Sequence, residues 1–492
     1  MNQYFRRSAR AIALVVAIGL AGASAQEPAP DTVHRLLVKD SVPWAIDRGI
    51  RDNDPPTPPR TFADARIDRS RANGDYLPGS LILKIRGRET FDVVSIAPGA
   101  DPERLAAEWS THPDVEYAQA RYRVHPAFVP NDPLYSRQWN LSAIDMEHAW
   151  DINPGASSSV IVAVLDTGLA YRNVTATFNG RADTFDGLFY PALGPVQVPF
   201  AAAPEIGAES RIVAPVDLIW QDTVPLDLDG HGTHVAGTIG QLTNNGVGTA
   251  GIAFNVRLMP VKVIDGPWDM FFRSPREGTD DIVARGVRHA VDNGARVLNM
   301  SIGRGGGPAP AVREAIQYAV SRGAFVVAAA GNEFGSANTD SRLAEFADDI
   351  DGMVAVSAIS RDGTRAYYSN VGPYVELTAP GGDQRRNGNA GGILQQTYDL
   401  DLVETYLLPP SRFRAPRFDA FTYEFFQGTS MAVPHVSGFA ALLIQQGITN
   451  PAAIEAAMKR YAIDLGAPGR DNAFGFGLIN PRATLRGLGL LR

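Results

Sequence analysis

The stretch VIVAVLDTG at residues 160–168 decides the fold class of this chain of 492 residues. Its first six residues are all apolar, which is typical of a strand covered on both faces in a parallel sheet. Residues 325–330, FVVAAA, have the same character, and 296–301 and 353–357 are further candidate strands. A helical pattern runs from 279 to 292, so strands and helices alternate. The sequence therefore predicts an α/β fold, with a mostly parallel central sheet flanked by helices.

Polar residues lie where three of these apolar runs end. Asp166, Ser301 and Asn332 close or follow the runs. In open α/β sheets, ligands bind beyond the carboxyl ends of the strands. These three residues are therefore the first candidates for a functional site.

Two further segments supply groups that acyl-transfer chemistry requires. Such chemistry needs a nucleophile, a base, a group that orients the base, and donors for an oxyanion. His231 lies in the glycine-rich segment DGHGTHVAGT, residues 229–238, where it suits a base at a helix N-terminus. Ser430 lies in GTSMAVPH, residues 428–435, and opens a helix whose positive end would meet negative charge. Asp166 precedes a Thr-Gly turn, which suits an orienting acid.

The segments around these residues resemble the subtilisin-like serine proteases, or subtilases. Four blocks match motifs of that family, and the chain order Asp, His, Ser is also the order of the family. The matching blocks are 164–168, 231–238, 329–332 and 428–432. The resemblance extends from about residue 130 to about 485, because 474–480 looks like the closing segment of the family.

The resemblance implies a role for each residue of the site. Ser430 would attack the scissile carbonyl, His231 would act as general base and then as general acid, and Asp166 would orient His231. Asn332 and the amide of Ser430 would bind the oxyanion. The implied enzyme is a serine endopeptidase that works through an acyl-enzyme on protein or peptide substrates and needs no cofactor for catalysis.

The segment Ser301, Ile302 and Gly303 resembles the strand with which this family pairs the substrate backbone. Glu333 follows Asn332 and could line the first specificity pocket, or it could be a solvated acid on a loop. Both alternatives stay open.

Residues 76–128 form a separate, small α/β unit by their pattern. Strand patterns occupy 80–85 and 91–96, and a helix runs from Asp101, its N-cap, to Ser110. The unit resembles the inhibitory prodomain that precedes subtilase catalytic domains, most clearly in PDVEYA at 113–118. This implies a precursor whose own prodomain is a partner.

The resemblance also implies where the precursor is cut. The prodomain would be removed by self-cleavage between about residues 125 and 135, and residues 129–492 would be the catalytic domain.

The first 25 residues have the features of a signal peptide. A basic start that contains Arg6 and Arg7 precedes an apolar run at 11–20 and a small-x-small cleavage pattern. We therefore expect a secreted or periplasmic protein without a permanent membrane anchor, while the adjacent arginines leave the twin-arginine export route open. Residues 26–75 are rich in proline and charge, which predicts a flexible segment.

Composition excludes several other classes of protein. The net charge is −8 and the pI about 5.6, so we expect no nucleic-acid partner. The chain has no cysteine, which excludes thiol catalysis and a disulfide framework. We expect a monomer.

A structural calcium ion stays an open prediction, because Asp227 and Asp229, together with Asn244 and Asn245, could supply oxygen ligands. No ligand set is assigned from the sequence.

Two other functions compete with the protease hypothesis. A catalytically silent subtilase-like binding protein would need a lost triad member or a blocked cleft. An esterase of the α/β-hydrolase type would need a Gly-x-Ser-x-Gly elbow, which Ser430 lacks. Residues 173–222 and 384–426 fit the alternation of strands and helices poorly, so we interpret both as insertions.

Overall fold

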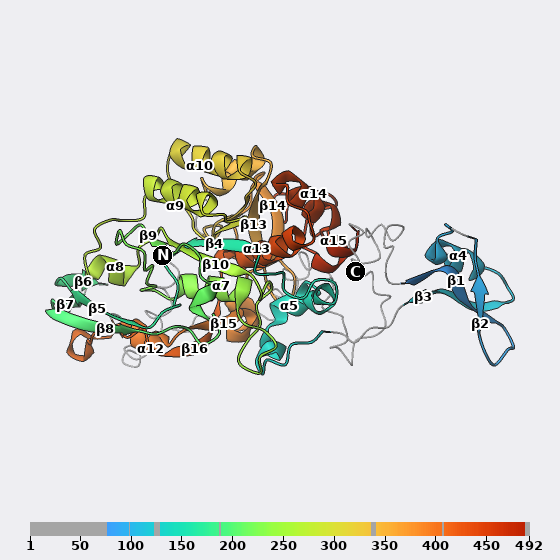
Figure 1. The fold of residues 1–492 in the computed structure, drawn as a ribbon, viewed down its shortest axis with the longest axis horizontal. Coiled ribbons are helices and arrows are strands. Elements are labelled where there is room, and N and C mark those ends of the chain that lie inside the picture. Colours follow the sequence, from blue (N-terminus) through green and yellow to red (C-terminus); the bar gives the residue numbers. More distant parts are fainter. Residues whose placement is uncertain are drawn as a thin grey trace, which may run out of the picture.

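The computed structural model describes residues 76–487, apart from 98, 123–127, 186–187, 336–340 and 406–407. Figure 1 shows a small N-terminal unit and a larger body that contains the central sheet. The predicted signal peptide and flexible segment, residues 1–75, lie outside the described residues.

A parallel sheet of seven strands forms the centre of the larger body, in the order β14-β13-β12-β11-β4-β10-β9. Its strands are β4 (Ile161–Asp166), β9 (Val216–Asp217), β10 (Arg257–Lys262), β11 (Val297–Met300), β12 (Phe325–Ala329), β13 (Met353–Ile359) and β14 (Val375–Pro380). Every residue of β4, β12 and β13 is buried, as continuous apolar runs require in a sheet covered on both faces. The predicted α/β fold with a mostly parallel sheet is confirmed.

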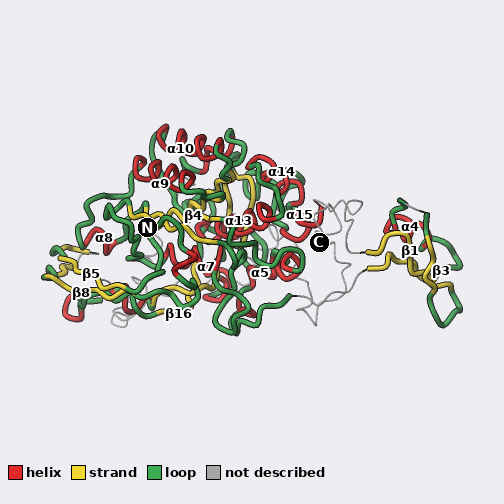
Figure 2. Tube along the Cα trace, in the orientation of Figure 1, coloured by secondary structure: helices red, strands yellow, loops and turns green. Residues whose placement is uncertain are grey.

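Helices cover both faces of this sheet (Figure 2). Val162 and Val164 of β4 belong to one hydrophobic cluster, together with the apolar residues of α7 and α13. The alternate residues Ala163 and Leu165 belong to a second cluster, with α9 and α10. The period of two along a strand thus sends neighbouring side chains into different cores.

The helices of the larger body are α5 (Trp139–Ala143), α6 (Met146–Trp150), α7 (His231–Gly240), α8 (Pro267–Phe271), α9 (Asp280–Asp292), α10 (Pro310–Ser321), α11 (Gln384–Asn387), α12 (Leu400–Val403), α13 (Thr429–Gln445), α14 (Pro451–Tyr461) and α15 (Pro481–Gly487). The helix that the sequence predicts over 279–292 is α9.

The N-terminal unit is an antiparallel sheet in the order β2-β1-β3 with one helix. Its elements are β1 (Tyr76–Ile85), β2 (Asp92–Ser95), α4 (Pro102–Trp109) and β3 (Val115–Tyr122). Asp101 caps α4 as predicted, because its Oδ1 accepts hydrogen bonds from the amides of Glu103 at 2.9 Å and Arg104 at 3.3 Å. Phe128 has its ring 5.6 Å from that of Trp150 in α6, so it packs with the larger body.

The two segments that the sequence marks as insertions form hairpins, but the first also contains β9, an edge strand of the central sheet, so 173–222 is not an insertion along its whole length. In the first, β5 (Val174–Asn179) pairs with β8 (Pro195–Phe200), and β6 (Asp183–Phe185) pairs with β7 (Leu188–Tyr190). In the second, β15 (Ile393–Tyr398) pairs with β16 (Phe421–Phe426). The hairpins contact each other: the rings of Phe200 and Phe418 stack with centroids 4.8 Å apart, and the amide of Phe418 donates to the carbonyl of Pro199 at 3.0 Å.

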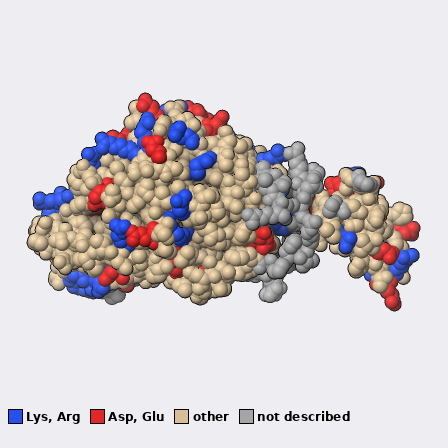
Figure 3. Space-filling view, in the orientation of Figure 1, with Lys and Arg blue, Asp and Glu red and all other residues tan. Residues whose placement is uncertain are grey.

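On the face that Figure 3 shows, lysine and arginine side chains are interspersed with aspartate and glutamate, as expected of a chain with a small net charge. Among the described residues, no helix combines the length and the apolar character that crossing a membrane requires.

Candidate active site

Asp166 is the last residue of β4 and is fully buried. Its Oδ1 accepts a hydrogen bond from the amide of Thr167 at 2.8 Å, while Oδ2 has no hydrogen-bond partner among the described residues. Gly168 follows with φ at +127°, and a Cβ there would lie 2.7 Å from the carbonyl oxygen of Leu226. The turn after Asp166 therefore requires glycine, and it leaves the carboxylate at the carboxyl end of the sheet.

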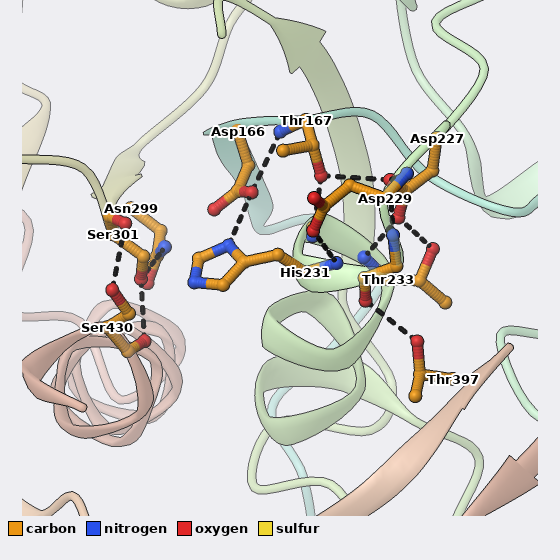
Figure 4. Close-up of polar contacts among 12 residues, drawn as sticks. Asp166, Thr167, Asp227, Asp229, His231, Thr233, Asn299, Ser301, Thr397 and Ser430 are labelled. Carbon is orange, nitrogen blue, oxygen red and sulfur yellow. Dashed lines mark hydrogen bonds and ion pairs between the residues drawn. The ribbon is translucent and has the colours of Figure 1, made fainter. Parts of the chain in front are cut away.

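His231 is the first residue of α7 and contacts Asp166 directly. Its Nδ1 lies 2.7 Å from Asp166 Oδ1, and the two side chains are 14% and 1% exposed. Figure 4 shows the imidazole ring pointing from α7 toward the side of the site where Ser430 lies. The structure thus brings together two of the three residues that the sequence proposes as a triad.

The charge around His231 favours the protonated imidazole. Burial lowers the pKa of His231, but the Asp166 carboxylate, by its charge and its hydrogen bond, and then Asp229 and Asp227, raise it to a value above 6.5. Burial and the neighbouring Asp227 raise the pKa of Asp229 to about 6. The Asp229 carboxylate is one of the charges that favour the imidazolium form of His231.

Ser430 is the second residue of α13, and its hydroxyl donates to the carbonyl of Ser301 at 3.1 Å. The Ser301 hydroxyl donates in turn to the carbonyl of Ser430 at 2.8 Å. No hydrogen bond between the described residues joins Ser430 to His231. The structure therefore pairs the candidate nucleophile with Ser301 and not with the candidate base.

Asn332 lies beside the amide of Ser430. Its Oδ1 accepts hydrogen bonds from the amide of Thr429 at 2.8 Å and from the Thr429 hydroxyl at 3.0 Å, which fixes the orientation of the side-chain amide. A Cβ built at Gly428 would lie 3.6 Å from the Ser430 nitrogen and 3.7 Å from Asn332 Nδ2. The two donors proposed for an oxyanion thus border the same space.

The predicted substrate-binding segment follows β11. Ser301 and Ile302 are buried, whereas Gly303 is exposed and a Cβ on it would meet nothing within 4 Å. The segment, which lies beyond the end of β11, is anchored at Ser301 and open at Gly303. The carboxylate of Glu333 accepts hydrogen bonds from the amide of Asn332 at 2.7 Å and from Asn370 Nδ2 at 2.9 Å.

The four residues considered for calcium do not form one cage. Asp227 and Asp229 precede α7, whereas Asn244 and Asn245 follow it, and a helix of 10 residues is about 15 Å long. The side-chain oxygen of Asn244 accepts from the amide of Asn131, and that of Asn245 from the amide of Val247. Among the described residues, no group of three or more histidine, cysteine, aspartate or glutamate side chains could hold a metal ion.

Two polar residues that support Ser301 were not predicted from the sequence. Asn299 Nδ2 donates to the Ser301 hydroxyl at 3.0 Å, and the Ser437 hydroxyl donates to Asn299 Oδ1 at 2.8 Å. Both residues are fully buried, and Ser437 lies in the same helix as Ser430. The sequence does contain a signal for them: Asn299 is a polar residue inside an otherwise apolar strand. A buried polar group needs hydrogen-bond partners, so its neighbours should also be polar.

Comparison with known proteins identifies the family of this chain. Residues 157–477, well over half of the chain, match the Subtilase family. The chain belongs to the subtilase family. The family also gives the class of enzyme, a serine endopeptidase, which confirms that part of the prediction from sequence.

Relatives of this subtilase are proteases from several bacteria. It is 28% identical to the thermophilic serine proteinase of Bacillus sp. (strain AK1), over 87% of this chain and 92% of the relative. It is 29% identical to thermitase of Thermoactinomyces vulgaris, over 70% of this chain and 98% of thermitase. Among solved structures, a protease from Pseudoalteromonas arctica superposes with a TM-score of 0.51 at 28% identity, over 73% of this chain and 99% of that protein.

Proposed function

We propose that this subtilase is an exported endopeptidase that cleaves peptide bonds with Ser430 as nucleophile, His231 as base and Asp166 as the group that orients the base. The observation that carries the proposal is the 2.7 Å contact between Asp166 Oδ1 and His231 Nδ1 at the start of α7. This contact holds the proton on Nδ1 and leaves Nε2 with a lone pair, as a general base requires.

Acylation requires one rearrangement of the site. The Ser430 hydroxyl leaves the carbonyl of Ser301 and turns to Nε2 of His231, a change of rotamer that substrate binding would induce. Nε2 then takes the hydroxyl proton as Oγ attacks the scissile carbonyl. The negative charge moves to the carbonyl oxygen, where Asn332 Nδ2 and the Ser430 amide donate to it.

The later steps return the proton. As the tetrahedral intermediate collapses, Nε2–H of His231 protonates the leaving amine, and the acyl group stays on Ser430 as an ester. A water molecule then attacks the ester, with His231 again taking a proton and giving it back to Oγ of Ser430. The substrate would lie along Ser301, Ile302 and Gly303, because an extended peptide needs main-chain partners.

The proposal is tested by digesting a peptide library with the purified mature protein and mapping the cleaved bonds by mass spectrometry. We expect internal cleavages that the Ser430→Ala protein, purified in the same way, does not make. Equal product patterns from the two proteins would refute the proposal and favour the catalytically silent binding protein. No candidate triad residue is missing from the sequence, so such a result would point to a blocked cleft.

We also propose that the unit from 76 to 128 is the inhibitory prodomain and that the chain is a self-processed precursor. One face of its sheet exposes large apolar side chains: Val93 is 51% and Tyr117 36% exposed, and Phe91, directly before β2, is 53% exposed. Such a concentration of apolar surface on a small unit favours a partner surface. Residues 123–127, which contain part of the expected cleavage region, lie outside the described residues.

Asn332→Leu is expected to lower kcat by about 10²–10³-fold, the loss measured for the equivalent donor in subtilisin, and to leave KM nearly unchanged. The reason is that Nδ2 meets negative charge only in the transition state. Steady-state kinetics on a chromogenic peptide give both constants. A rise in KM with kcat preserved would instead place Asn332 in ground-state binding.

The acid limb of the pH profile of kcat/KM should report the raised pKa of His231. The base works only when neutral, so activity is lost on the acid side and appears as the pH rises through a midpoint above 6.5. Asp229→Asn removes a charge that favours the imidazolium, and the midpoint should therefore move to lower pH. Glu209→Gln, which removes an exposed carboxylate paired with Arg172, is the control that should leave the midpoint in place. A midpoint unaffected by Asp229→Asn would contradict this electrostatic account.

A further inference from the structure

A fully buried carboxylate that the proposed mechanism does not use lies behind His231. Asp227 is 0% exposed, and both of its oxygens are occupied (Figure 4). Oδ1 accepts hydrogen bonds from the Thr167 hydroxyl at 2.9 Å, the Asp229 amide at 3.1 Å and the Gly230 amide at 2.8 Å. Oδ2 accepts from the amide of Thr233 at 2.9 Å and from the Thr233 hydroxyl at 2.6 Å. A buried charge is tolerated when it is saturated in this way.

The partners of Asp227 belong to the two segments that carry the candidate acid and base. Thr167 directly follows Asp166, and its hydroxyl also accepts a hydrogen bond from the amide of Gly232 at 2.9 Å. Thr233 lies in the first turn of α7, and its hydroxyl accepts from the amide of Ala170 at 3.0 Å. Each threonine therefore links the turn after β4 to the start of α7, and Asp227 joins the two threonines.

The same contacts satisfy the free amides at the start of α7. The first amides of a helix have no partner within the helix, and Gly230 at the N-cap has no side chain to offer them. The amide of His231 donates to Asp229 Oδ1 at 3.2 Å, that of Gly232 to Thr167, and that of Thr233 to Asp227. The backbone of His231 is thus fixed from outside the helix.

The approach of the two segments is also sterically tight. A Cβ on Gly232 would lie 2.3 Å from the carbonyl oxygen of Gly168, so the first turn of α7 rests against the turn after Asp166. A small shift of either segment would change the 2.7 Å contact between Asp166 and His231. Misplacement by about 1 Å can cost about 10²-fold in rate.

We infer that Asp227 is a positioning residue: it acts through Thr167 and Thr233 to hold Asp166 and His231 in hydrogen-bonding register. The inference rests on the proposed function, since it assigns Asp227 a place in that same site. Asp227 touches neither substrate nor the reacting atoms, and its five accepted hydrogen bonds explain why it is not available as a calcium ligand.

The test compares three variants. Thr167→Val and Thr167→Ser preserve the charge of Asp227, whereas Asp227→Asn removes it. Thr167→Val removes the hydroxyl that joins Asp227 to the amide of Gly232, whereas Thr167→Ser keeps it. We expect Thr167→Val to lower kcat by about 10–10²-fold with little change in KM, and Thr167→Ser to restore most of the rate. Asp227→Asn should lower kcat similarly. An asparagine NH₂ group in place of Oδ2 would face the backbone N–H of Thr233, so that two donors would meet. Asp227→Asn should also move the pH midpoint downward, because the Asp227 charge helps to raise the pKa of His231.

A spectroscopic readout separates positioning from a general loss of stability. The Nδ1 proton of His231 in a short bond to Asp166 should give a resolved, far-downfield NMR resonance. We expect Asp227→Asn and Thr167→Val to shift or broaden it. The control is Asp471→Asn, which changes a carboxylate that accepts three backbone amides in the C-terminal loop and should leave the resonance and the pH midpoint in place.

The outcomes distinguish this inference from the proposed function. The resonance is recorded in the Ser430→Ala chain, so it does not depend on activity. If Asp227→Asn does not fold, the Thr167 pair alone decides. If Thr167→Val leaves the His231 resonance unchanged and keeps kcat within about twofold of the wild-type value, the positioning role is overturned. This holds even if the wild-type chain cleaves peptides through Ser430. Absence of Ser430-dependent cleavage would refute the proposed function instead.

Discussion

Ser430→Ala is expected to lower kcat by about 10⁶-fold, the loss measured when the corresponding serine of subtilisin is removed. Alanine keeps the helix start but has no oxygen to form the ester, so only the oxyanion donors and substrate binding can still promote hydrolysis. His231→Ala should cost about as much, because Ser430 without a base is a weak nucleophile. Steady-state hydrolysis of a chromogenic peptide measures both losses.

The double variant is the informative control. Residues that act as a unit are not additive, so Ser430→Ala combined with His231→Ala should be no slower than either single variant. Losses that multiply would mean that the two side chains act independently. The Ser430→Ala precursor also tests self-processing: it should keep the unit from 76 to 128 after purification, while the wild-type precursor loses it. Maturation of the variant alone would show that another protease makes the cut.

Asp166→Asn should lower kcat by about 10⁴-fold while leaving the fold intact, as the same change does in serine proteases with this triad. An asparagine that donates to Nδ1 of His231 would force the ring proton onto Nε2, where it blocks the transfer from Ser430. The expected signature is a loss in kcat with a small change in KM, measured on the same peptide.

Thermal unfolding of the Asp166→Asn protein provides the check on stability. An amide nitrogen that donates to His231 Nδ1 takes the place of Oδ1, where it also faces the amide of Thr167 and removes the acceptor of that amide. A melting midpoint close to that of the wild type would assign the lost rate to the tautomer of His231. A loss of less than about tenfold would instead mean that His231 does not depend on Asp166 for its orientation.

Local patterns were enough to predict the centre of this fold. The apolar runs that became β4, β12 and β13 are buried along their whole length, as is typical of strands in a covered parallel sheet. Asp166 and Asn332 were found because they directly end or follow such runs. Capping by Asp101 was predicted because it depends on neighbours only two and three residues away.

Features that depend on distant contacts could not be predicted in the same way. The Ser430 hydroxyl bonds to Ser301, 129 positions away, and no local rule fixes that rotamer. Asp227 was considered as a metal ligand because acidic residues near asparagines suggest calcium, but its partner Thr167 lies 60 positions away. The insertions were recognised by their misfit alone, and their mutual packing through Phe200 and Phe418 was invisible in either segment.

That packing makes the two hairpins one structural unit. Phe178 and Phe200 of the first hairpin are buried, and so is Phe418 of the second, which lies between β15 and β16 in the chain. Transplanting either hairpin alone into another scaffold would expose aromatic rings to water and strip Phe418 of its bonded neighbour, Pro199. Chimeras of this enzyme must therefore exchange the hairpins of 174–200 and 393–426 together.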